Sequence, residues 1–341
     1  MDDQQTQPES YRNALRVFCY RMLASLRKAD EVANDAICLV GSQPDDLSAG
    51  NMLEDLLFRQ AVRACLTETA ASPRRTLPAL LSSPADPARE PAPPCRSDAW
   101  LDPFPDEWVP DGESGESARY GARESISLTL IAALQTIPPV ARAAHILVDI
   151  CSLQTDRVAK IVGVDRVRCR RLLNEARREM ERTYDARLGR QEPPPQDRSM
   201  ELSMRYLYPW ETADLAAFLE RLTETVVWQM PPSPSWFRGR ESLRNWAARN
   251  VLNDDARGCW RLLPRRSNGQ LAFGLYQLYP STATYHAHSL QILRFAGELV
   301  SEIISFVDTT LFPFYGLLSE YTFQGYNNWR GPTTSAGRKG G

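Results

Sequence analysis

Residues 123–184 read RESISLTLIAALQTIPPVARAAHILVDICSLQTDRVAKIVGVDRVRCRRLLNEARREMERTY, and several local signals agree within them. Apolar residues recur at helical spacing from Ile126 to Ile137, and Pro138-Pro139 then ends the helix that they predict. A second apolar run covers 143–150, and a short helical segment over 155–162 follows. The stretch therefore predicts several short helices joined by tight turns.

A longer helix follows a turn at Gly163. It begins after Asp165, a residue type that caps helix N-termini, and its inward stripe is predicted to be Cys169, Leu172, Leu173, Ala176 and Met180. The opposite side carries arginines at positions 166, 168, 170, 171, 177 and 178. A short helix, a glycine turn and a helix with a basic outer face form the helix-turn-helix layout, whose second helix enters the major groove of DNA. A solvated arginine face on ordinary helix packing is the alternative.

This stretch resembles region 4 of extracytoplasmic-function (ECF) sigma factors of the sigma-70 family, through ESARYGARESISLTLIAALQTIPPVARAAHILVDI (116–150) and VAKIVGV (158–164). It is most similar to the subgroup that carries an extra SnoaL-like domain after region 4. The resemblance implies a module that reads the −35 promoter element and docks on RNA polymerase. The DNA contacts that it implies are Arg166, Arg168, Arg170, Arg171 and Asn174. The chain departs from the family at Val148 and Leu153, where arginine and tryptophan are usual.

Composition limits the class of protein. At 341 residues the chain is expected to hold two or three domains, and 43% hydrophobic residues are enough to build their cores. A net charge of −2 excludes a general polyanion binder, so basic character is local. The 7 cysteines show no CxxC spacing, which favours a reduced, cytoplasmic protein with buried thiols over a disulfide or zinc framework. No signal peptide, membrane span or cofactor is expected.

Residues 11–70 are predicted to form a helical domain. Amphipathic patterns cover 11–27, 29–40 and 53–67, and the first carries on one face Leu15, Phe18, Cys19, Met22, Leu23 and Leu26. From YRNALRVFCYRMLASLRKADEV (11–32) through RACLTET (63–69), the sequence resembles sigma region 2 of the same subgroup.

The resemblance to region 2 breaks at the surface that opens promoter DNA in the family. Sigma factors place aromatic and basic residues there, because an unstacked base needs an aromatic or cationic platform. This chain has Leu39 to Ser42 and then Asp45-Asp46, and Leu56 stands where the family has tryptophan. Glu54 and Asp55 replace basic or neutral positions and would repel phosphate. We expect the fold to be kept and the chemistry at the −10 element to be lost or weakened.

Two linkers separate the predicted domains. Over residues 71–118 the many prolines prevent regular secondary structure and favour an extended linker. They stand at positions 73, 78, 84, 87, 91, 93, 94, 103, 105 and 110. Within this linker DAWLDPFPDEW (98–108) resembles a short segment that this sigma subgroup carries between regions 2 and 4. We expect it to be anchored on a neighbouring domain by Trp100, Phe104 and Trp108. The region 4-like domain is expected over 119–187, and the second linker over 188–199.

A different kind of domain is predicted over 200–323, before a flexible tail at 324–341. Helices are expected over 212–222 and 238–252, with a strand over 225–231 between them. Four strand patterns follow, over 259–265, 270–279, 285–293 and 299–307, and Asn268-Gly269 predicts a hairpin between the first two. Helices followed by an antiparallel sheet are typical of α+β domains. The whole chain is therefore expected to be mainly α in its N-terminal half and α+β in its C-terminal domain.

This domain resembles a SnoaL-like domain of nuclear-transport-factor-2-like cone fold, through MPPSPSWFRGRESL (230–243), NGQLAFGLYQ (268–277), YHAHSLQIL (285–293) and ISFVDTTLFPFYGL (304–317). The resemblance implies an enclosed pocket, which in SnoaL itself is an aldol-cyclase site. A pocket of this kind needs an apolar wall with a few converging polar groups. The candidate lining residues are Trp228, Trp236, Arg240, Tyr276, His286, His288, Gln291 and Asp308.

Strand alternation places His286 and His288 on one face and Gln291 on the other, so these three cannot line one cavity. The two histidines supply only two metal ligands, and no metal site is expected. A His288–Asp308 acid/base pair is the enzymatic hypothesis, with Asp308 orienting the imidazole. The alternative is that Asp308 caps the turn before Thr309.

Three functions from different classes remain open. The first is a sigma-like transcription factor whose C-terminal domain senses a ligand or braces the sigma regions. The second is a SnoaL-type enzyme, a cyclase, isomerase or aldol catalyst, on a repurposed sigma scaffold. The third is a non-catalytic regulator that binds a ligand or partner. The extent of the resemblance favours the first, with RNA polymerase core, promoter DNA carrying a −35 type element and a small apolar ligand as partners.

Overall fold

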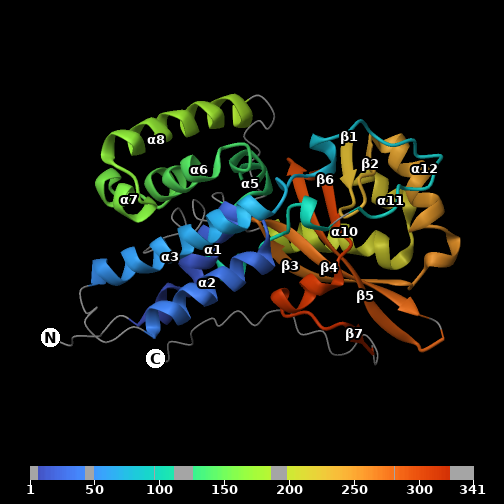
Figure 1. The fold of residues 1–341 in the computed structure, drawn as a ribbon. Coiled ribbons are helices and arrows are strands. Elements are labelled where there is room, and N and C mark those ends of the chain that lie inside the picture. The colour runs from blue at the N-terminus through green and yellow to red at the C-terminus, as the bar shows by residue number, and fades with distance from the viewer. Residues whose placement is uncertain are drawn as a thin grey trace, which may run out of the picture.

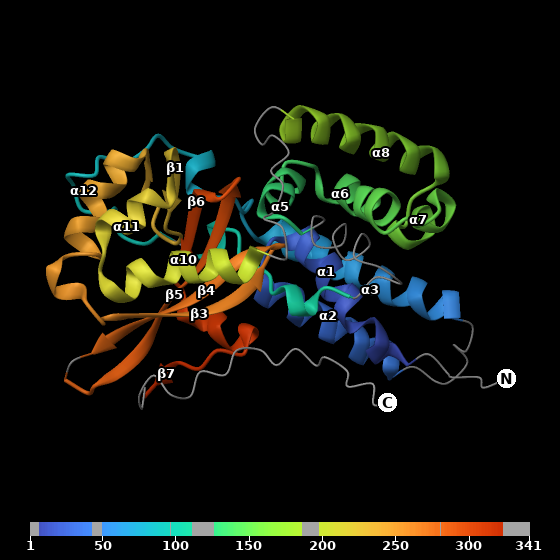
Figure 2. The ribbon, with the colours of Figure 1, turned by 180° about the vertical axis from the view of Figure 1, so that it is seen from behind.

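A computed structural model describes residues 7–42, 50–95, 97–110, 126–185, 198–279 and 281–322. The N-terminal half is helical and the C-terminal domain is built on one mixed sheet, as the sequence predicts (Figure 1). Figure 2 shows the same two halves from behind, lying side by side. None of the helices in these ranges has the length and apolar character that a membrane crossing requires.

The first unit is a bundle of three helices, α1 (Arg12–Leu23), α2 (Leu26–Gly41) and α3 (Gly50–Ala71), preceded by the 3-10 turn η1 (Pro8–Tyr11). The predicted apolar stripes face one another in its core. Phe18 of α1 meets Phe58 of α3 edge to face, with ring centroids 5.4 Å apart. The bundle is therefore held mainly by burial of apolar area.

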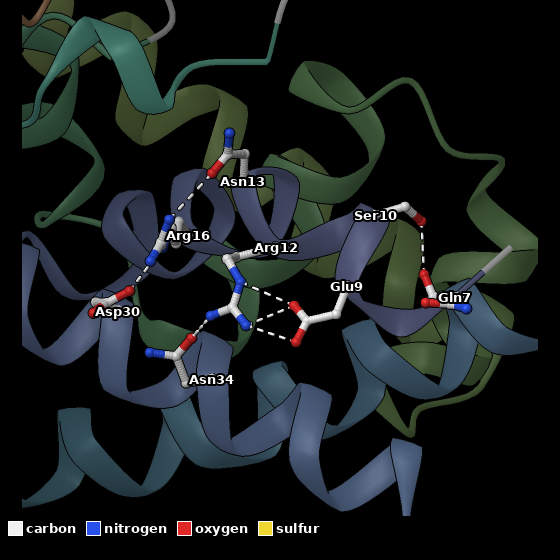
Figure 3. Close-up of polar contacts among 8 residues, drawn as sticks. All are labelled: Gln7, Glu9, Ser10, Arg12, Asn13, Arg16, Asp30 and Asn34. Atoms are coloured by element: carbon white, nitrogen blue, oxygen red, sulfur yellow. Dashed lines mark hydrogen bonds and ion pairs between the residues drawn. The ribbon is translucent and has the colours of Figure 1, made fainter.

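Two arginines tie the start of α1 to its surroundings (Figure 3). The Arg12 guanidinium donates to both carboxylate oxygens of Glu9 and to the side-chain oxygen of Asn34 on α2. Arg16 donates its Nε–H to Asp30 of α2 at 2.7 Å. These side chains are partly exposed, so the contacts orient α1 against α2 and add little stability.

The second unit contains α5 (Leu128–Leu134), α6 (Pro139–His145), α7 (Thr155–Val162) and α8 (Arg166–Met180). The apolar run predicts α6 only from Ala143, because two prolines look like a helix stop. The structure instead starts α6 at Pro139, where the fixed φ of proline suits the first helical turn. α6 continues as the π-helical turn η5 (Ile146–Ile150), and α8 as η6 (Glu181–Asp185). Figure 1 shows α8 on the outside of the molecule.

The C-terminal domain is a seven-stranded sheet with strand order β2-β1-β6-β5-β4-β3, and β7 pairs with β5. β1 and β6 run parallel, and the other neighbouring pairs are antiparallel. The predicted hairpin joins β3 to β4 through Asn268 and Gly269, both at positive φ. The strands are β1 (Leu222–Gln229), β2 (Trp236–Arg238), β3 (Trp260–Ser267), β4 (Gln270–Tyr279), β5 (Thr284–Ala296), β6 (Leu299–Phe306) and β7 (Glu320–Tyr321).

The two faces of this sheet are covered differently. One face packs on α10 (Ser199–Thr212), α11 (Leu215–Glu220) and α12 (Arg240–Asn250), over a core of large aromatic side chains. The other face packs on η9 (Thr309–Tyr315) and on the helical half. Residues of that face, such as Leu290 and Ile292, belong to the same hydrophobic cluster as the three-helix bundle. The two halves of the chain therefore share one core.

Residues 72–95 and 97–110 form a strap between the two halves, drawn in blue-green in Figure 1. The strap bonds to the C-terminal domain through its backbone, with Ala85 N–H donating to the Trp236 carbonyl at 2.7 Å. It then returns to α1, where Phe104 is fully buried against Tyr20, ring centroids 4.6 Å apart. Trp108 packs on Phe314 of η9. The expected anchoring of this segment by its aromatic residues is thus seen in the structure, and Trp100 is buried as well.

Candidate nucleic-acid interface

The helix-turn-helix forms from local sequence signals. Gly163 ends α7 at a φ of 77°, a conformation that glycine adopts without strain. Asp165 caps α8, as predicted, by accepting the backbone N–H of Arg168 at 2.8 Å. Cys169, Leu173 and Ala176 are buried on the inner side of α8, which packs on α6 and α7. The outer side of α8 is thereby fixed toward solvent.

That outer side presents a polar and cationic stripe. Arg168, Arg170, Arg171 and Asn174 are all exposed, and Val167 beside them is 71% exposed. Most of this stripe lines one side of a groove of about 950 Å³. The lining of the groove contains two glutamates and a larger number of arginines. The α8 side of this groove is formed by Val167, Arg170, Arg171, Asn174, Glu175, Arg178 and Glu179, and other parts of the chain add Arg74, Thr136, Pro138 and Arg182.

The five residues predicted to contact DNA are not equivalent in the structure. Arg170, Arg171 and Asn174 lie together in the groove, whereas Arg168 is exposed outside its lining. Arg166 forms an ion pair with Asp156 of α7 at 2.8 Å, which occupies part of its hydrogen-bonding capacity. Arg74 was not predicted as part of this surface, because nothing in its local sequence reveals that the start of the strap meets α8 across the groove.

The residues predicted to line a pocket in the C-terminal domain are dispersed. The Trp228 indole donates to Ser305 at 2.9 Å, and the Trp236 indole donates to the Ser82 carbonyl of the strap at 3.1 Å. Arg240 donates to the Leu222 carbonyl and pairs with Glu224. His286 pairs with Glu320 of β7 at 3.3 Å, and Tyr276 donates to the Leu318 carbonyl from the sheet face opposite Trp228. These contacts do not assemble one cavity from the predicted set.

The space under the helices is occupied by rings. Trp210 meets Trp228, Trp260 and Phe218 with ring centroids 5.7–6.0 Å apart, and Trp246 meets Trp228 at 4.8 Å. Rings at these separations pack edge to face, and such pairs stabilise the fold by more than the burial of their apolar area alone. Trp228, which we interpreted as a residue that lines a cavity, therefore packs within this aromatic core.

The alternation predicted for β5 is wrong at His288. Leu275 of β4 pairs with Ser289, but Tyr276 pairs with Ala287, so His288 is the extra residue of a β-bulge. His288 packs edge to face on Trp260, and Gln291 accepts a hydrogen bond from Tyr206 at 2.9 Å. Both residues thus contact the same aromatic core, which strict alternation excludes. Burial lowers the pKa of His288, which favours a neutral imidazole.

Asp308 does not orient His288 in the part of the chain that the structure describes. Its carboxylate accepts the backbone N–H of Thr310 at 3.0 Å and pairs with Arg27 of α2 at 3.1 Å. His288 instead contacts Ser289 and Trp260. The capping alternative therefore describes Asp308, which in addition joins the C-terminal domain to the helical half.

No protein-family model matches the chain. Over 310 residues it is 31% identical to the ECF RNA polymerase sigma factor SigG of Mycobacterium tuberculosis, in two strains, and the match covers 91% of this chain and 82% of SigG. This chain belongs to the ECF RNA polymerase sigma factors. It is accordingly a sigma-factor-like transcription regulator. The crystal structure of the M. tuberculosis ECF sigma factor SigJ shares its fold, with a TM-score of 0.54 at 16% identity over 91% of this chain and 98% of SigJ.

The region 2-like surface of this sigma factor needs one correction. Glu54 and Asp55 both pair with Arg157 of α7, so they do not face solvent as free charges that would repel phosphate. They join the three-helix bundle to the helix-turn-helix instead. Leu56 packs half-buried against the core, and Leu39 is 50% exposed. Asp45-Asp46 lie outside the described residues.

Proposed function

We propose that this sigma factor binds the core of RNA polymerase and directs it to promoters through α8, which lies in the major groove of a −35 type element. Family membership supports the choice of polymerase and promoter DNA as partners. The proposal that α8 reads promoter DNA rests on the exposed polar and cationic stripe of this helix. The proposal is tested by measuring how the purified chain binds core polymerase and promoter DNA.

The chemistry of the stripe suits base edges and phosphates. Arginine can bond the O6 and N7 of guanine together, and asparagine can do the same with N6 and N7 of adenine. Arg170, Arg171 and Asn174 offer these groups from successive turns of one helix. Arg168 sits in the first turn of α8, where the recognition helices of this motif approach DNA.

For the C-terminal domain we propose a bracing role. Asn268, at the β3–β4 hairpin, is only 1% exposed, and its side chain reaches three separate parts of the chain. Its amide donates to the Tyr20 hydroxyl of α1 at 3.0 Å and to the Ile126 carbonyl before α5 at 2.6 Å. Its oxygen accepts the Phe104 N–H of the strap at 2.8 Å. One side chain thus connects both sigma-like units, the strap and the sheet.

Two buried aspartates of the strap support the same junction. Asp102 accepts the Ser25 hydroxyl and the Leu26 N–H at the start of α2, at 2.8 and 2.9 Å. Asp106 accepts the Gly269 N–H of the hairpin at 2.8 Å. A buried carboxylate that accepts such bonds is costly to remove, because its partners are left without an acceptor. The junction is therefore built to hold one arrangement of the units.

The enzymatic alternative finds less support than bracing. The proposed proton-transfer group, His288, contacts the aromatic core and Ser289, and its proposed partner Asp308 lies at the junction with α2. An acid/base pair needs its two groups within hydrogen-bond reach of each other or of a shared substrate.

We expect promoter opening by this chain with core polymerase to be weak. Leu39 to Ser42 and Leu56 offer no aromatic or cationic platform on which an unstacked base could rest. Permanganate footprinting should therefore show few reactive thymines near −10 on a promoter that the complex occupies. The matched variant Leu56→Trp restores the aromatic residue usual in the family, and it should raise the reactivity if the platform limits opening. Strong reactivity with the unchanged chain would contradict this prediction.

A further inference from the structure

A second and smaller cavity, of about 280 Å³, adjoins the groove beside α8. It lies where the end of α1, the end of α3 and the connection between α5 and α6 meet. It shares Arg74, Thr136 and Pro138 with the groove, so the two spaces lie next to each other. Its lining is rich in basic and hydroxyl groups and includes Ser25, Lys28, Thr69, Ser72, Arg75 and Arg142.

Arg142 is the unusual member of this lining. The residue is only 5% exposed, and its terminal nitrogens donate to the Met22, Gln135 and Ile137 carbonyls and to the Gln135 side-chain oxygen. None of these acceptors carries a charge. Its Nε–H is buried and has no acceptor among the described residues. A guanidinium held this way keeps its positive charge inside the protein without a carboxylate beside it, which is unfavourable unless an anion compensates.

The nearby charge of Arg74 adds to the positive charge around Arg142. Burial and this charge lower the pKa of Arg142 to about 10, because both disfavour the charged form of its guanidinium. Two of the other cations in the lining have carboxylates near them. Lys28 pairs with Glu31 at 2.9 Å and with Glu68 at 3.8 Å, and Arg75 lies 4.0 Å from Asp102. Glu68 is the one acidic residue in the lining.

We propose that this cavity binds the phosphate group of a small anionic ligand, between the region 2-like and region 4-like units. The buried Arg142 guanidinium, whose acceptors are all uncharged, and the nearby charge of Arg74 match a ligand that carries more than one negative charge, as a phosphate or pyrophosphate does. The hydroxyls of Thr69 and Ser72 provide further donors to its oxygens. The volume accommodates such a group and excludes a DNA duplex. A bound anion would connect the end of α3 to the α5–α6 connection and so stabilise their contact.

Isothermal titration of the full chain with pyrophosphate, at constant ionic strength, tests the proposal. Arg74 is exposed, so Arg74→Gln should leave the fold intact and weaken pyrophosphate binding about tenfold, the loss that one charge-assisted hydrogen bond carries. Arg182→Gln is the matched control, because Arg182 lines the groove and not the smaller cavity. It should bind pyrophosphate as the unchanged chain does. Lys28 lines the smaller cavity and not the groove, and Lys28→Gln should weaken binding as Arg74→Gln does.

Three results would overturn the proposal. The first is an absence of pyrophosphate binding by the unchanged chain. The second is equal weakening by Arg182→Gln, which would place the anion in the open groove. The third is a chain that binds duplex DNA but not pyrophosphate and loses DNA affinity on Arg74→Gln, which would make Arg74 a contact to the DNA backbone. If the Arg168→Ala variant binds pyrophosphate as tightly as the unchanged chain does, the anion site is distinct from the α8 surface that is proposed to read promoters.

Discussion

Replacing Arg168, Arg170 and Arg171 together with alanine is expected to weaken promoter binding roughly 100-fold or more, since each good contact to a base or phosphate is worth at least about 1 kcal/mol. The three side chains are exposed and lie off the buried side of α8, so the fold should survive their removal. The dependence of affinity on salt should flatten as well. Each lost phosphate contact lowers the slope of log K against log salt by about 0.9.

Fluorescence anisotropy at several salt concentrations measures both effects for the complex of this chain with core polymerase, on a duplex that the unchanged complex selects from a random pool. Arg244→Ala is the matched control, because Arg244 is an exposed arginine of α12 that pairs with Glu241 at 3.1 Å and lies outside the lining of the groove. The corresponding ion pair joins residues three apart on one helix, so its loss should not affect α8. Arg244→Ala should alter affinity far less than the triple variant. If the triple variant and the unchanged chain give equal affinities at two salt concentrations, α8 does not contribute to promoter binding.

Replacing Asn268 with glycine is expected to lower the free energy of unfolding by about 3–4 kcal/mol, because several buried partners lose their hydrogen bonds at once. Glycine is the appropriate substitution here, since the residue has a φ of 53° and any other side chain would add backbone strain. The Phe104 N–H and the Ile126 carbonyl would be left buried without this partner. Urea unfolding measures the change.

Ala283→Gly is the matched control for backbone geometry. Ala283 also has a positive φ, 51°, but it is exposed and lies in the β4–β5 connection, away from the junction. Its replacement should change the free energy of unfolding by less than about 1 kcal/mol. Equal effects of the two substitutions would show that Asn268 acts through its backbone and not as a connection between the units. The account of the C-terminal domain as a brace would then lose its main support.

The parts of the fold that could be predicted depend on local signals. The helix from Thr155 to Val162, the turn at Gly163 and the cap at Asp165 follow from residue type and spacing alone, and the structure shows all three. The Asn268-Gly269 hairpin is predicted in the same way, because only a few residue pairs accept two successive positive φ angles. Family membership adds the overall arrangement.

The parts that could not be predicted depend on contacts between distant residues. α10 was missed, and one helix was predicted over 212–222. Pro209 lies inside α10, and exposed Met200, Met204 and Tyr208 obscure its apolar stripe. The structure instead ends α10 at Thr212 and begins α11 at Leu215. The bulge at His288 has no signal in the sequence of β5, because it arises from pairing with β4.

The candidate site likewise has features that follow from local sequence and features that depend on contacts between distant residues. The exposed arginines of α8 could be predicted, because the buried stripe of a helix fixes its opposite face. The pairing of Glu54 and Asp55 with Arg157 could not, since it joins helices about one hundred residues apart in the chain. The aromatic residues of the C-terminal domain predict burial correctly. Their sequence does not distinguish a ring that lines a cavity from one that fills it.

The most direct measurement of the central claim is a DNase I footprint on a promoter fragment, made with core RNA polymerase in the presence and absence of this chain. The account predicts protection over a −35 type element only when both proteins are present. It also predicts that the Arg168, Arg170 and Arg171 triple alanine variant abolishes this protection. A footprint that stays the same whether or not the chain is added would contradict the claim that the chain directs polymerase to promoters through α8.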